Sequence, residues 1–396
     1  MELNQYKIGI ISTHPIQYYS PLYKAVSDHP EINLKVYYCH KQTQENHGES
    51  GFGVKFDWDI DLLDGYKYKF LNNVSAKPNV DSIWGCDTPE IYDEIKKEKF
   101  DAVIVSGWYV KSYIQAIWAC WRTNTPVIVR SDSHLNTNRS FLRKIIKYPL
   151  YRGFIPRFDA YLYVGKRSLE YLLYYGANRE KMFFSPHTVD NKYFKENSKL
   201  NSSKLESVKT NLNIPHDSII FLFVGKLIDI KRPMDFLESI KISYKTNKNI
   251  FGIMAGEGEL KSKCVNFIKN NNLPVRCLGF VNQSKMPEIY ALSDILVVTS
   301  ESETWGLVVN EAMASGLTAI CSVTVGCVND LIIEDETGIF YKKGDIKELA
   351  ENMSRLLKKN NKLDEMKIRA QEHIQNYSVE KNVENIIKTL KYLKEK

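Results

Sequence analysis

The chain has 396 residues, of which 43% are hydrophobic, and its 54 Lys and Arg against 47 Asp and Glu give a net charge of +7. This length accommodates two domains with separate cores, and no run of about 20 apolar residues provides a transmembrane helix. The first residues lead directly into an apolar segment without signal-peptide features, so we expect a cytoplasmic protein, or one at the inner face of the cell membrane. Seven cysteines without a Cys-x-x-Cys pair predict reduced thiols and no structural zinc.

In the first half of the chain, short apolar segments alternate with helical segments. The predicted strands are residues 8–12, 34–39, 102–106, 127–130 and 160–164. This alternation is typical of a doubly wound α/β domain built on a parallel sheet.

Residues 139–157 interleave basic residues with aromatic and aliphatic ones and contain no acid. One interpretation is contact with a membrane surface. The other is an ordinary amphipathic helix over residues 140–148, packed on the sheet with Lys and Arg in water. Nucleic acid is not an expected partner, because no recognition motif accompanies the charge.

A polar stretch rich in Asn, Ser and Lys separates two series of elements, and the second series starts with the strand 219–224. The predicted organisation is an N-terminal domain over 1–195, a linker over 196–215 and a C-terminal domain over 216–377. The linker is expected to be irregular or to contain a short helix over 203–211. Apolar residues at helical spacing predict a last helix within 378–396.

Within the second series, a strand over 295–299 is followed by a polar loop, a helix that Gly316 caps, and a strand over 318–322. Glu303 falls in the loop and Glu311 about one turn inside the helix. The helix start at Gly306 and Leu307 offers unpaired N–H groups that suit a diphosphate, while carboxylates suit sugar and ribose hydroxyls. The pattern favours a nucleotide-sugar site, and its alternative is a pair of solvated helix glutamates.

Residues 300–316 resemble the Glu-x7-Glu motif of the retaining glycosyltransferases of family 4, which have the GT-B fold. Upstream, 221–233 resembles the family's Gly-Arg-Leu strand end with a lysine five residues after the arginine, with Lys226 in place of that arginine. The further segments that resemble family junctions, in chain order, are 184–194, 252–260, 278–281 and 286–294. The resemblance covers essentially the whole chain.

The resemblance implies a GT-B architecture, with two facing Rossmann-like doubly wound domains and a cleft between them. It also implies that the helix within 378–396 packs back on the first domain. The glycines at 256 and 258 predict a close backbone approach or a positive φ, and such a Gly-x-Gly turn is more often a tight loop than a ligand site.

The resemblance implies that the C-terminal domain binds a nucleotide diphosphate sugar. Lys226 and Lys231 would stabilise the departing diphosphate, although a solvated basic run is the alternative for both. Glu303 would orient the donor sugar, and Glu311 would hold the ribose. The remaining expected donor contacts are Gly225, Phe280, Val281, Thr304, Trp305, Gly306 and Leu307, with Phe280 and Val281 beside the base.

Acceptor contacts are expected in the N-terminal domain. After the first strand, His14, Gln17 and Tyr18 stand where many relatives have a glycine-rich loop, so we expect them to contact the acceptor. His187 either joins them or serves as a structural hydrogen-bond partner. Either Asp132 or His134 corresponds to the family's histidine near the reacting sugar, with a helix N-cap at residues 131–133 as the alternative.

The resemblance thus implies retaining transfer of a sugar, with UDP as the expected nucleotide, to a hydroxyl of a glycan or lipid-linked glycan. Richness in Lys, Asn, Ile and Tyr is typical of AT-rich bacteria and suggests surface polysaccharide synthesis. A nucleotide-sugar epimerase, a phosphorylase and a non-catalytic sugar-nucleotide-binding scaffold are the alternatives. No cofactor or metal is expected, because the acidic motif at residues 57–59 is more simply a strand face or hairpin.

Overall fold

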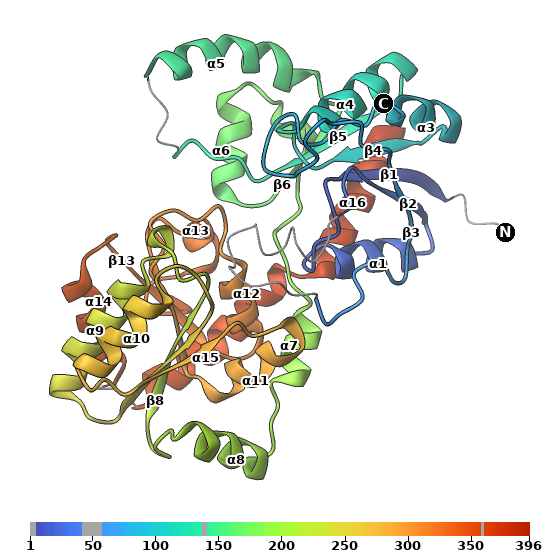
Figure 1. Ribbon diagram of the computed structural model, residues 1–396. Coiled ribbons are helices and arrows are strands. Elements are labelled where there is room, and N and C mark those ends of the chain that lie inside the picture. Colours follow the sequence, from blue (N-terminus) through green and yellow to red (C-terminus); the bar gives the residue numbers. More distant parts are fainter. Residues whose placement is uncertain (1–4, 42–57, 137–140, 358–359) are drawn as a thin grey trace. The chain divides into compact units, whose positions relative to one another are not determined.

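The computed structural model describes residues 5–41, 58–136, 141–357 and 360–396 (Figure 1). The chain divides into two compact units. Of the described residues, unit 1 contains 5–41, 61–136, 141–187 and 378–396, and unit 2 contains 58–60, 188–357 and 360–377. Asp57, part of the acidic motif noted in the sequence, lies outside the described residues.

Unit 1 is built on a parallel sheet with the strand order β3-β2-β1-β4-β5-β6-β7. The strands are β1 (Tyr6–Ser12), β2 (Ile32–Tyr38), β3 (Lys67–Phe70), β4 (Ala102–Val105), β5 (Val127–Ser131), β6 (Ala160–Tyr163) and β7 (Met182–Phe184). The central strands are apolar and buried, as expected when helices cover both faces of a parallel sheet.

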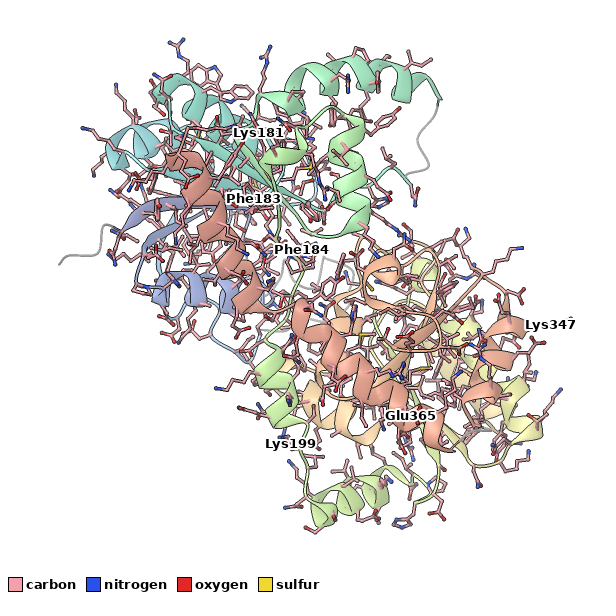
Figure 2. The ribbon with its side chains drawn as sticks, turned by 180° about the vertical axis from the view of Figure 1, so that it is seen from behind. Lys181, Phe183, Phe184, Lys199, Lys347 and Glu365 are labelled. Atoms are coloured by element: carbon pink, nitrogen blue, oxygen red, sulfur yellow. The ribbon has the colours of Figure 1, made fainter. Side chains whose placement is uncertain are left out.

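The helices of unit 1 cover both faces of this sheet. They are α1 (Ser20–Asp28), α3 (Ile91–Glu98), α4 (Lys111–Thr123), α5 (Phe141–Phe154), η2 (Ile155–Arg157), α6 (Lys166–Tyr174), η3 (Arg179–Lys181) and α16 (Val379–Lys394). Apolar residues of α1 and α16 pack on one face, and those of α3, α4 and α6 on the other. Figure 2 labels Phe183 and Phe184 on β7, which contact Tyr392 of α16 and Tyr163 of β6, respectively.

Unit 2 contains a second parallel sheet with the order β10-β9-β8-β11-β12-β13. Its strands are β8 (Ile219–Val224), β9 (Ile250–Ala255), β10 (Val275–Gly279), β11 (Ile295–Val298), β12 (Thr318–Ser322) and β13 (Gly338–Tyr341). Its helices are α7 (Asn191–Asn197), α8 (Ser202–Leu212), η4 (Asp229–Lys231), α9 (Pro233–Thr246), α10 (Lys261–Asn270), η5 (Gln283–Lys285), α11 (Met286–Leu292), α12 (Leu307–Ala314), α13 (Val328–Leu331), α14 (Ile346–Leu357), α15 (Asn360–His373) and η6 (Ile374–Asn376).

Counted within each unit, both sheets begin with the order 3-2-1-4-5-6 of the doubly wound dinucleotide-binding fold. The predicted fold class of two parallel-sheet, Rossmann-like α/β domains is therefore confirmed. In such sheets the strand order reverses next to the first strand, and ligands bind outside the carboxyl ends of the strands there. In unit 2 this switch point lies between β8 and β11, which pair directly.

The boundary between the units falls earlier than residue 195, because α7 packs on unit 2. Phe194 is buried with its ring 5.9 Å from that of Tyr290, and Asn191 Nδ2 donates to the Ile374 carbonyl at 3.1 Å. The expected linker contains α8, which is longer by one residue at each end than the helix considered for residues 203–211. No helix among the described residues is long and apolar enough to cross a membrane.

Candidate active site

Two loops leave the switch point of the unit 2 sheet. β8 is almost entirely buried and ends at Val224, so Gly225 and Lys226 emerge at its carboxyl end. β11 is buried throughout and ends at Val298, so the loop that carries Glu303 emerges beside it. Parallel pairing places both loops at the same edge of the sheet.

Glu303 and Lys231 form an ion pair at this edge. The Lys231 ammonium donates to Glu303 Oε2, and the Ser300 hydroxyl donates to the same oxygen at 3.4 Å. Thr299 Oγ1 donates to the Lys231 carbonyl at 2.7 Å and so fixes η4 on the end of β11. Both charged side chains keep about a quarter of their surface exposed, at 25% for Lys231 and 22% for Glu303. Two residues singled out from the sequence are thus brought together, and a diphosphate would have to replace the carboxylate as the partner of this ammonium.

Two glycines allow neighbouring loops to approach Gly225. A Cβ atom at Gly256 would overlap with the Gly225 carbonyl oxygen, and one at Gly258 would lie 2.5 Å from the Leu227 carbonyl oxygen. The Gly225 and Leu227 N–H groups donate to the Ala255 and Glu257 carbonyls at 3.0 and 2.7 Å. The close backbone approach that the sequence predicted for these glycines is present.

The helix α12 starts immediately after Gly306, whose φ of +99° favours glycine. Among the described residues no side chain caps this start. The adjoining loop is held by the Cys327 N–H, which donates to the Trp305 carbonyl at 2.9 Å. The first-turn N–H groups of α12 therefore provide the kind of helix start that binds anions.

Glu311 is the fifth residue of α12 and is 2% exposed. The Tyr290 hydroxyl donates to its Oε2 at 2.6 Å, and Gln283 Nε2 donates to its Oε1 at 3.3 Å. The alternative of a solvated helix glutamate is therefore wrong for Glu311. A carboxylate can accept further hydrogen bonds at both oxygens, so its expected role at a ribose stays a prediction.

Trp305 packs inside unit 2. Its side chain is 5% exposed, and its Nε1–H donates to Asn310 Oδ1 at 2.9 Å. The indole also lies 6.3 Å from the ring of Tyr377. Contact with a donor would therefore fall to the backbone of Trp305, whereas Thr304 is exposed and Leu307 half-buried.

Phe280 and Val281 follow β10 and are both half-buried. Gly279, with a φ of +77°, accepts a hydrogen bond from the Gly256 N–H at 2.8 Å. The segment expected beside the base is thus tied through Gly256 to the loop that approaches Gly225.

Arg130, which no sequence motif indicated, organises the corresponding strand ends in unit 1. It is half-buried at the end of β5, and its guanidinium donates to the Tyr19 hydroxyl at 3.2 Å and to the Pro186 carbonyl at 3.1 Å. It also lies 5.2 Å from the centroid of the Tyr19 ring. The signal in the sequence was a lone charged residue that ends an apolar strand.

His187 lies beside Asp132, with 3.8 Å between Nε2 and Oδ2. His187 is 6% exposed, and burial lowers its pKa, although interaction with the Asp132 carboxylate acts in the opposite direction. The side chain of Asp132 is half exposed. Ser131, rather than Asp132, makes the local turn contact, since its hydroxyl accepts from the Ser133 N–H at 3.2 Å. His134 is half-buried two residues further on.

His14, Gln17 and Tyr18 lie in the connection between β1 and α1 and are half-buried. The Thr13 hydroxyl is 3.0 Å from His14 Nδ1, and the Tyr19 N–H donates to the Ile16 carbonyl at 2.9 Å. This connection is a side-chain-rich turn, in contrast to the glycine loops of unit 2.

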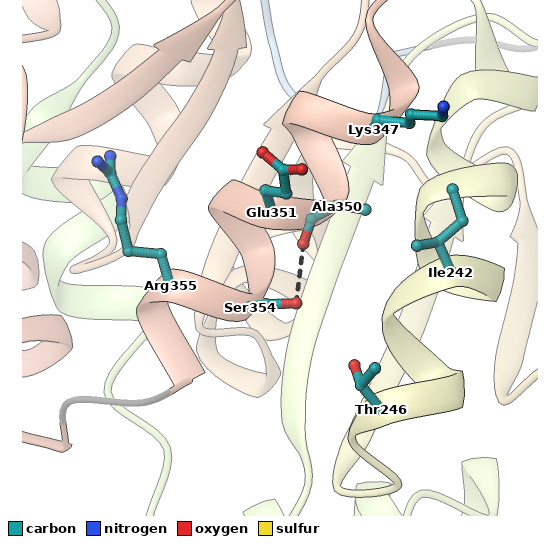
Figure 3. A pocket seen from close by; sticks show the side chains of 7 residues that line it. All are labelled: Ile242, Thr246, Lys347, Ala350, Glu351, Ser354 and Arg355. Carbon is teal, nitrogen blue, oxygen red and sulfur yellow. Dashed lines mark hydrogen bonds between the residues drawn. The ribbon is translucent and has the colours of Figure 1, made fainter.

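A groove of about 650 Å³ on unit 2 lies away from all of these residues. Figure 3 shows it between α9, which contributes Ile242 and Thr246, and α14. It contains none of the predicted site residues. The described residues also include no group of three or more His, Cys, Asp or Glu placed to hold a metal ion.

Residues 206–373 match the family model described as "Glycosyl transferases group 1". This match confirms the resemblance to group 1 glycosyltransferases that the sequence predicted. The matched region contains both loops of the switch point, with Lys226, Lys231, Glu303 and Glu311.

Curated relatives share this group 1 similarity over part of their length. The chain is 27% identical over 155 residues to N-acetyl-alpha-D-glucosaminyl L-malate synthase of Bacillus anthracis, covering 39% of this chain and 40% of that protein. It is 30% identical over 140 residues to UDP-Gal:alpha-D-GlcNAc-diphosphoundecaprenol alpha-1,3-galactosyltransferase of Escherichia coli, covering 34% and 35%. The matches thus span less than half the length of these relatives.

The fold of the whole chain is similar to that of a glycosyltransferase from Rickettsia africae. The TM-score is 0.74 at 16% identity, with 98% of this chain and 99% of that chain covered. At this identity the similarity establishes the fold alone.

Proposed function

We propose that the protein is a retaining glycosyltransferase that moves a sugar from a nucleoside diphosphate sugar to a hydroxyl of a glycan or lipid-linked glycan. The observation that carries this proposal is the Lys231–Glu303 pair at the switch point of a group 1 region. UDP is the proposed nucleotide, and surface polysaccharide synthesis the proposed context. Both draw support from the Escherichia coli relative, whose name specifies a UDP-galactose donor and a diphosphoundecaprenol-linked acceptor.

In the proposed site, Lys231 exchanges Glu303 for the donor diphosphate, and Lys226 adds a second cation from the loop after β8. The two ammonium groups would stabilise the charge that grows on the leaving diphosphate, a task that a divalent cation performs in many phosphoryl-transfer sites. The N–H groups at the start of α12 would add dipolar stabilisation. We therefore propose a reaction with no metal or organic cofactor.

Release of Glu303 from Lys231 would leave its carboxylate available for donor-sugar hydroxyls. Glu311, already oriented by Tyr290 and Gln283, would accept hydrogen bonds from the ribose hydroxyls. Phe280 and Val281 would border the base. Unit 1 would supply acceptor contacts from His14, Gln17, Tyr18 and His187, with Asp132 or His134 near the reacting sugar.

The anomeric configuration would be retained if the acceptor hydroxyl attacks the sugar from the same side from which the diphosphate leaves. An oxygen of the leaving phosphate would then accept the proton of the acceptor hydroxyl. Positioning and electrostatic stabilisation would then supply most of the rate enhancement.

The experiment is a transfer assay with a panel of UDP-, GDP- and ADP-sugars and polyprenyl-diphosphate-linked or free glycan acceptors. The proposal predicts release of nucleoside diphosphate that depends on the acceptor and yields an α-linked product from an α-linked donor. Sugar exchange without an acceptor would indicate an epimerase, and phosphate-dependent release of sugar phosphate would indicate a phosphorylase. Tight donor binding without either reaction would indicate a scaffold.

A further inference from the structure

The helix α5 turns apolar side chains away from unit 1. Ile145 is 51% exposed, and Ile146 and Leu150 are each 64% exposed. Pro149, inside the helix, is exposed as well, and α5 continues beyond it to Phe154. In Figures 1 and 2, α5 runs beside α6 along the outside of unit 1. The other side of α5 carries Tyr151 and Phe154, which pack against the core of unit 1. The helix therefore exposes a second apolar stripe in addition to the one that normally faces the core.

A lysine on the opposite side of α5 fixes this orientation. Lys147 donates to the Tyr171 hydroxyl at 2.8 Å and lies 4.5, 4.8 and 5.2 Å from the ring centroids of Tyr151, Tyr171 and Tyr175. Tyr171 and Tyr175 are buried. Rotation of α5 that buried its isoleucines would break these cation–π contacts, each worth roughly 0.5–2 kcal/mol.

The alternative of a helix over 140–148 with its apolar side on the sheet and its cations in water is therefore wrong for 145–148. Ile145 and Ile146 face outward, and Lys147 faces the buried tyrosines. Residues 139 and 140 lie outside the described residues, so the surface defined next starts at Ile145.

The exposed apolar residues continue from α5 onto α6. The rings of Tyr148 and Tyr174 are 5.3 Å apart and are 40% and 49% exposed, and Leu173 is 41% exposed. The α5 face consists of Ile145, Ile146, Tyr148, Leu150, Leu173 and Tyr174. These are two isoleucines and two leucines with two tyrosines whose hydroxyls remain polar.

Exposed cations border the α5 face. Arg152, Arg157 and Lys166 are exposed, and residues 141–158 contain no acid. Glu170 is the acidic residue of α6. An apolar centre with tyrosines and basic residues at its edge is the composition of helices that lie in the interface of a membrane with anionic lipids.

We propose that the α5 face docks on an anionic lipid bilayer, with Ile146 and Leu150 inserted among the acyl chains and Arg152 and Arg157 at the headgroups. A second copy of the chain fits less well, because a two-fold interface would bring the same arginines of both copies together. The inference adds a partner to the proposed transferase but does not depend on its chemistry.

The test is co-sedimentation of the full chain with vesicles of phosphatidylcholine alone and of phosphatidylcholine mixed with phosphatidylglycerol. The variant Ile146→Ser/Leu150→Ser removes the apolar centre, and Ile368→Ser is the matched control, since Ile368 on α15 is 60% exposed. We expect the double variant to lose roughly tenfold or more in partitioning to the mixed vesicles, and the control to match wild type. Arg152→Ser should lose roughly fivefold at low salt and little at high salt.

Equal partitioning of wild type and the double variant, or no binding of wild type to mixed vesicles, would overturn the proposal. So would a dimer on gel filtration that the double variant converts to a monomer, because the face would then join two copies. The vesicle assay contains no sugar donor, so its result does not depend on whether the protein is a transferase. Donor titration without lipid likewise tests the transferase proposal independently of membrane binding.

Discussion

The two sheets share one strand order, but different kinds of residues follow the carboxyl ends of their strands. In unit 2 the ends carry glycines, a Lys–Glu pair that is about a quarter exposed, and a helix start that no described side chain caps. In unit 1 they carry side chains that contact one another, with Arg130 tied to Tyr19 and Pro186 and His187 beside Asp132. The two units thus present different chemistry at the same topological position, as expected when topology sets the place of a site and the loops set its chemistry.

The consequence is a division of labour that variants can test. Unit 2 presents N–H groups and the ammonium of a partly exposed ion pair, which suit a diphosphate. Unit 1 presents histidines, tyrosines and a carboxylate, which suit neutral hydroxyls. Changes in unit 2 should therefore act on donor use, and changes in unit 1 on acceptor use or local stability.

The largest expected effect is that of Lys231→Ala. Loss of a cation that stabilises the leaving diphosphate should lower kcat roughly a hundred- to a thousandfold. The matched control is Lys362→Ala, which removes a lysine paired with Asp335 at 2.7 Å elsewhere in unit 2. Steady-state transfer assays would measure both, and similar activity of the two variants would refute the assignment of Lys231.

Gly256→Ala should destabilise unit 2 by about 3 kcal/mol, because its Cβ would overlap with the Gly225 carbonyl oxygen. Gly107→Ala is the comparison in unit 1. Gly107 also follows a strand and has a φ of +96°, but its Cβ would meet open space, so only backbone strain of about 1 kcal/mol is expected. Native-state hydrogen exchange resolves each unit separately. Equal losses in both variants would contradict the close approach.

Arg130→Met should weaken unit 1 by about 2 kcal/mol, since the hydrogen bonds that its partly buried guanidinium donates to Tyr19, Ser185 and Pro186 are lost. Donor affinity should stay at the wild-type value. Arg276→Met is the control, because Arg276 also donates from a strand to a backbone carbonyl, that of Leu212, but in unit 2. Loss of donor binding in the Arg130 variant would contradict the assignment of donor binding to unit 2 alone.

The smallest expected effect concerns pH. The folded-state pKa of His187 lies below its usual value, so its contribution to stability is present above about pH 6.5, the unfolded pKa, and is lost as the pH falls through the folded pKa. His187→Gln should therefore reduce the acid-side loss of stability of unit 1, by less than about 1 kcal/mol. Hydrogen exchange of unit 1 at several pH values measures this. An unchanged acid-side slope would mean that His187 titrates normally.

The sequence predicted the central strands well because their apolar runs are buried on both faces; 219–224 and 318–322 match β8 and β12. It missed β3 and β7, which are short and lie at the sheet edges. β3 contains two lysines, and neither strand has the buried run that identifies a central strand.

For the site, spacing within one segment was sufficient to place Glu303 before α12 and Glu311 one turn inside it. The Tyr290 and Gln283 contacts to Glu311, the Arg130 network and the inward Lys147 depend on side chains far apart in the sequence. Such contacts leave no local pattern. The sequence left two interpretations of residues 139–157 open for the same reason, since periodicity gives an apolar stripe but not the direction that it faces.

The most direct test of the central claim is calorimetric titration of UDP, GDP and ADP into wild type, Lys231→Ala and Glu303→Gln. If the Lys231–Glu303 pair opens to admit a diphosphate, one nucleotide binds wild type, and Lys231→Ala weakens it roughly ten- to a hundredfold. Glu303→Gln should bind that nucleotide at least as tightly as wild type, because its lysine no longer has to leave a carboxylate. Equal binding by wild type and Lys231→Ala, or loss of binding in Glu303→Gln, would contradict the account.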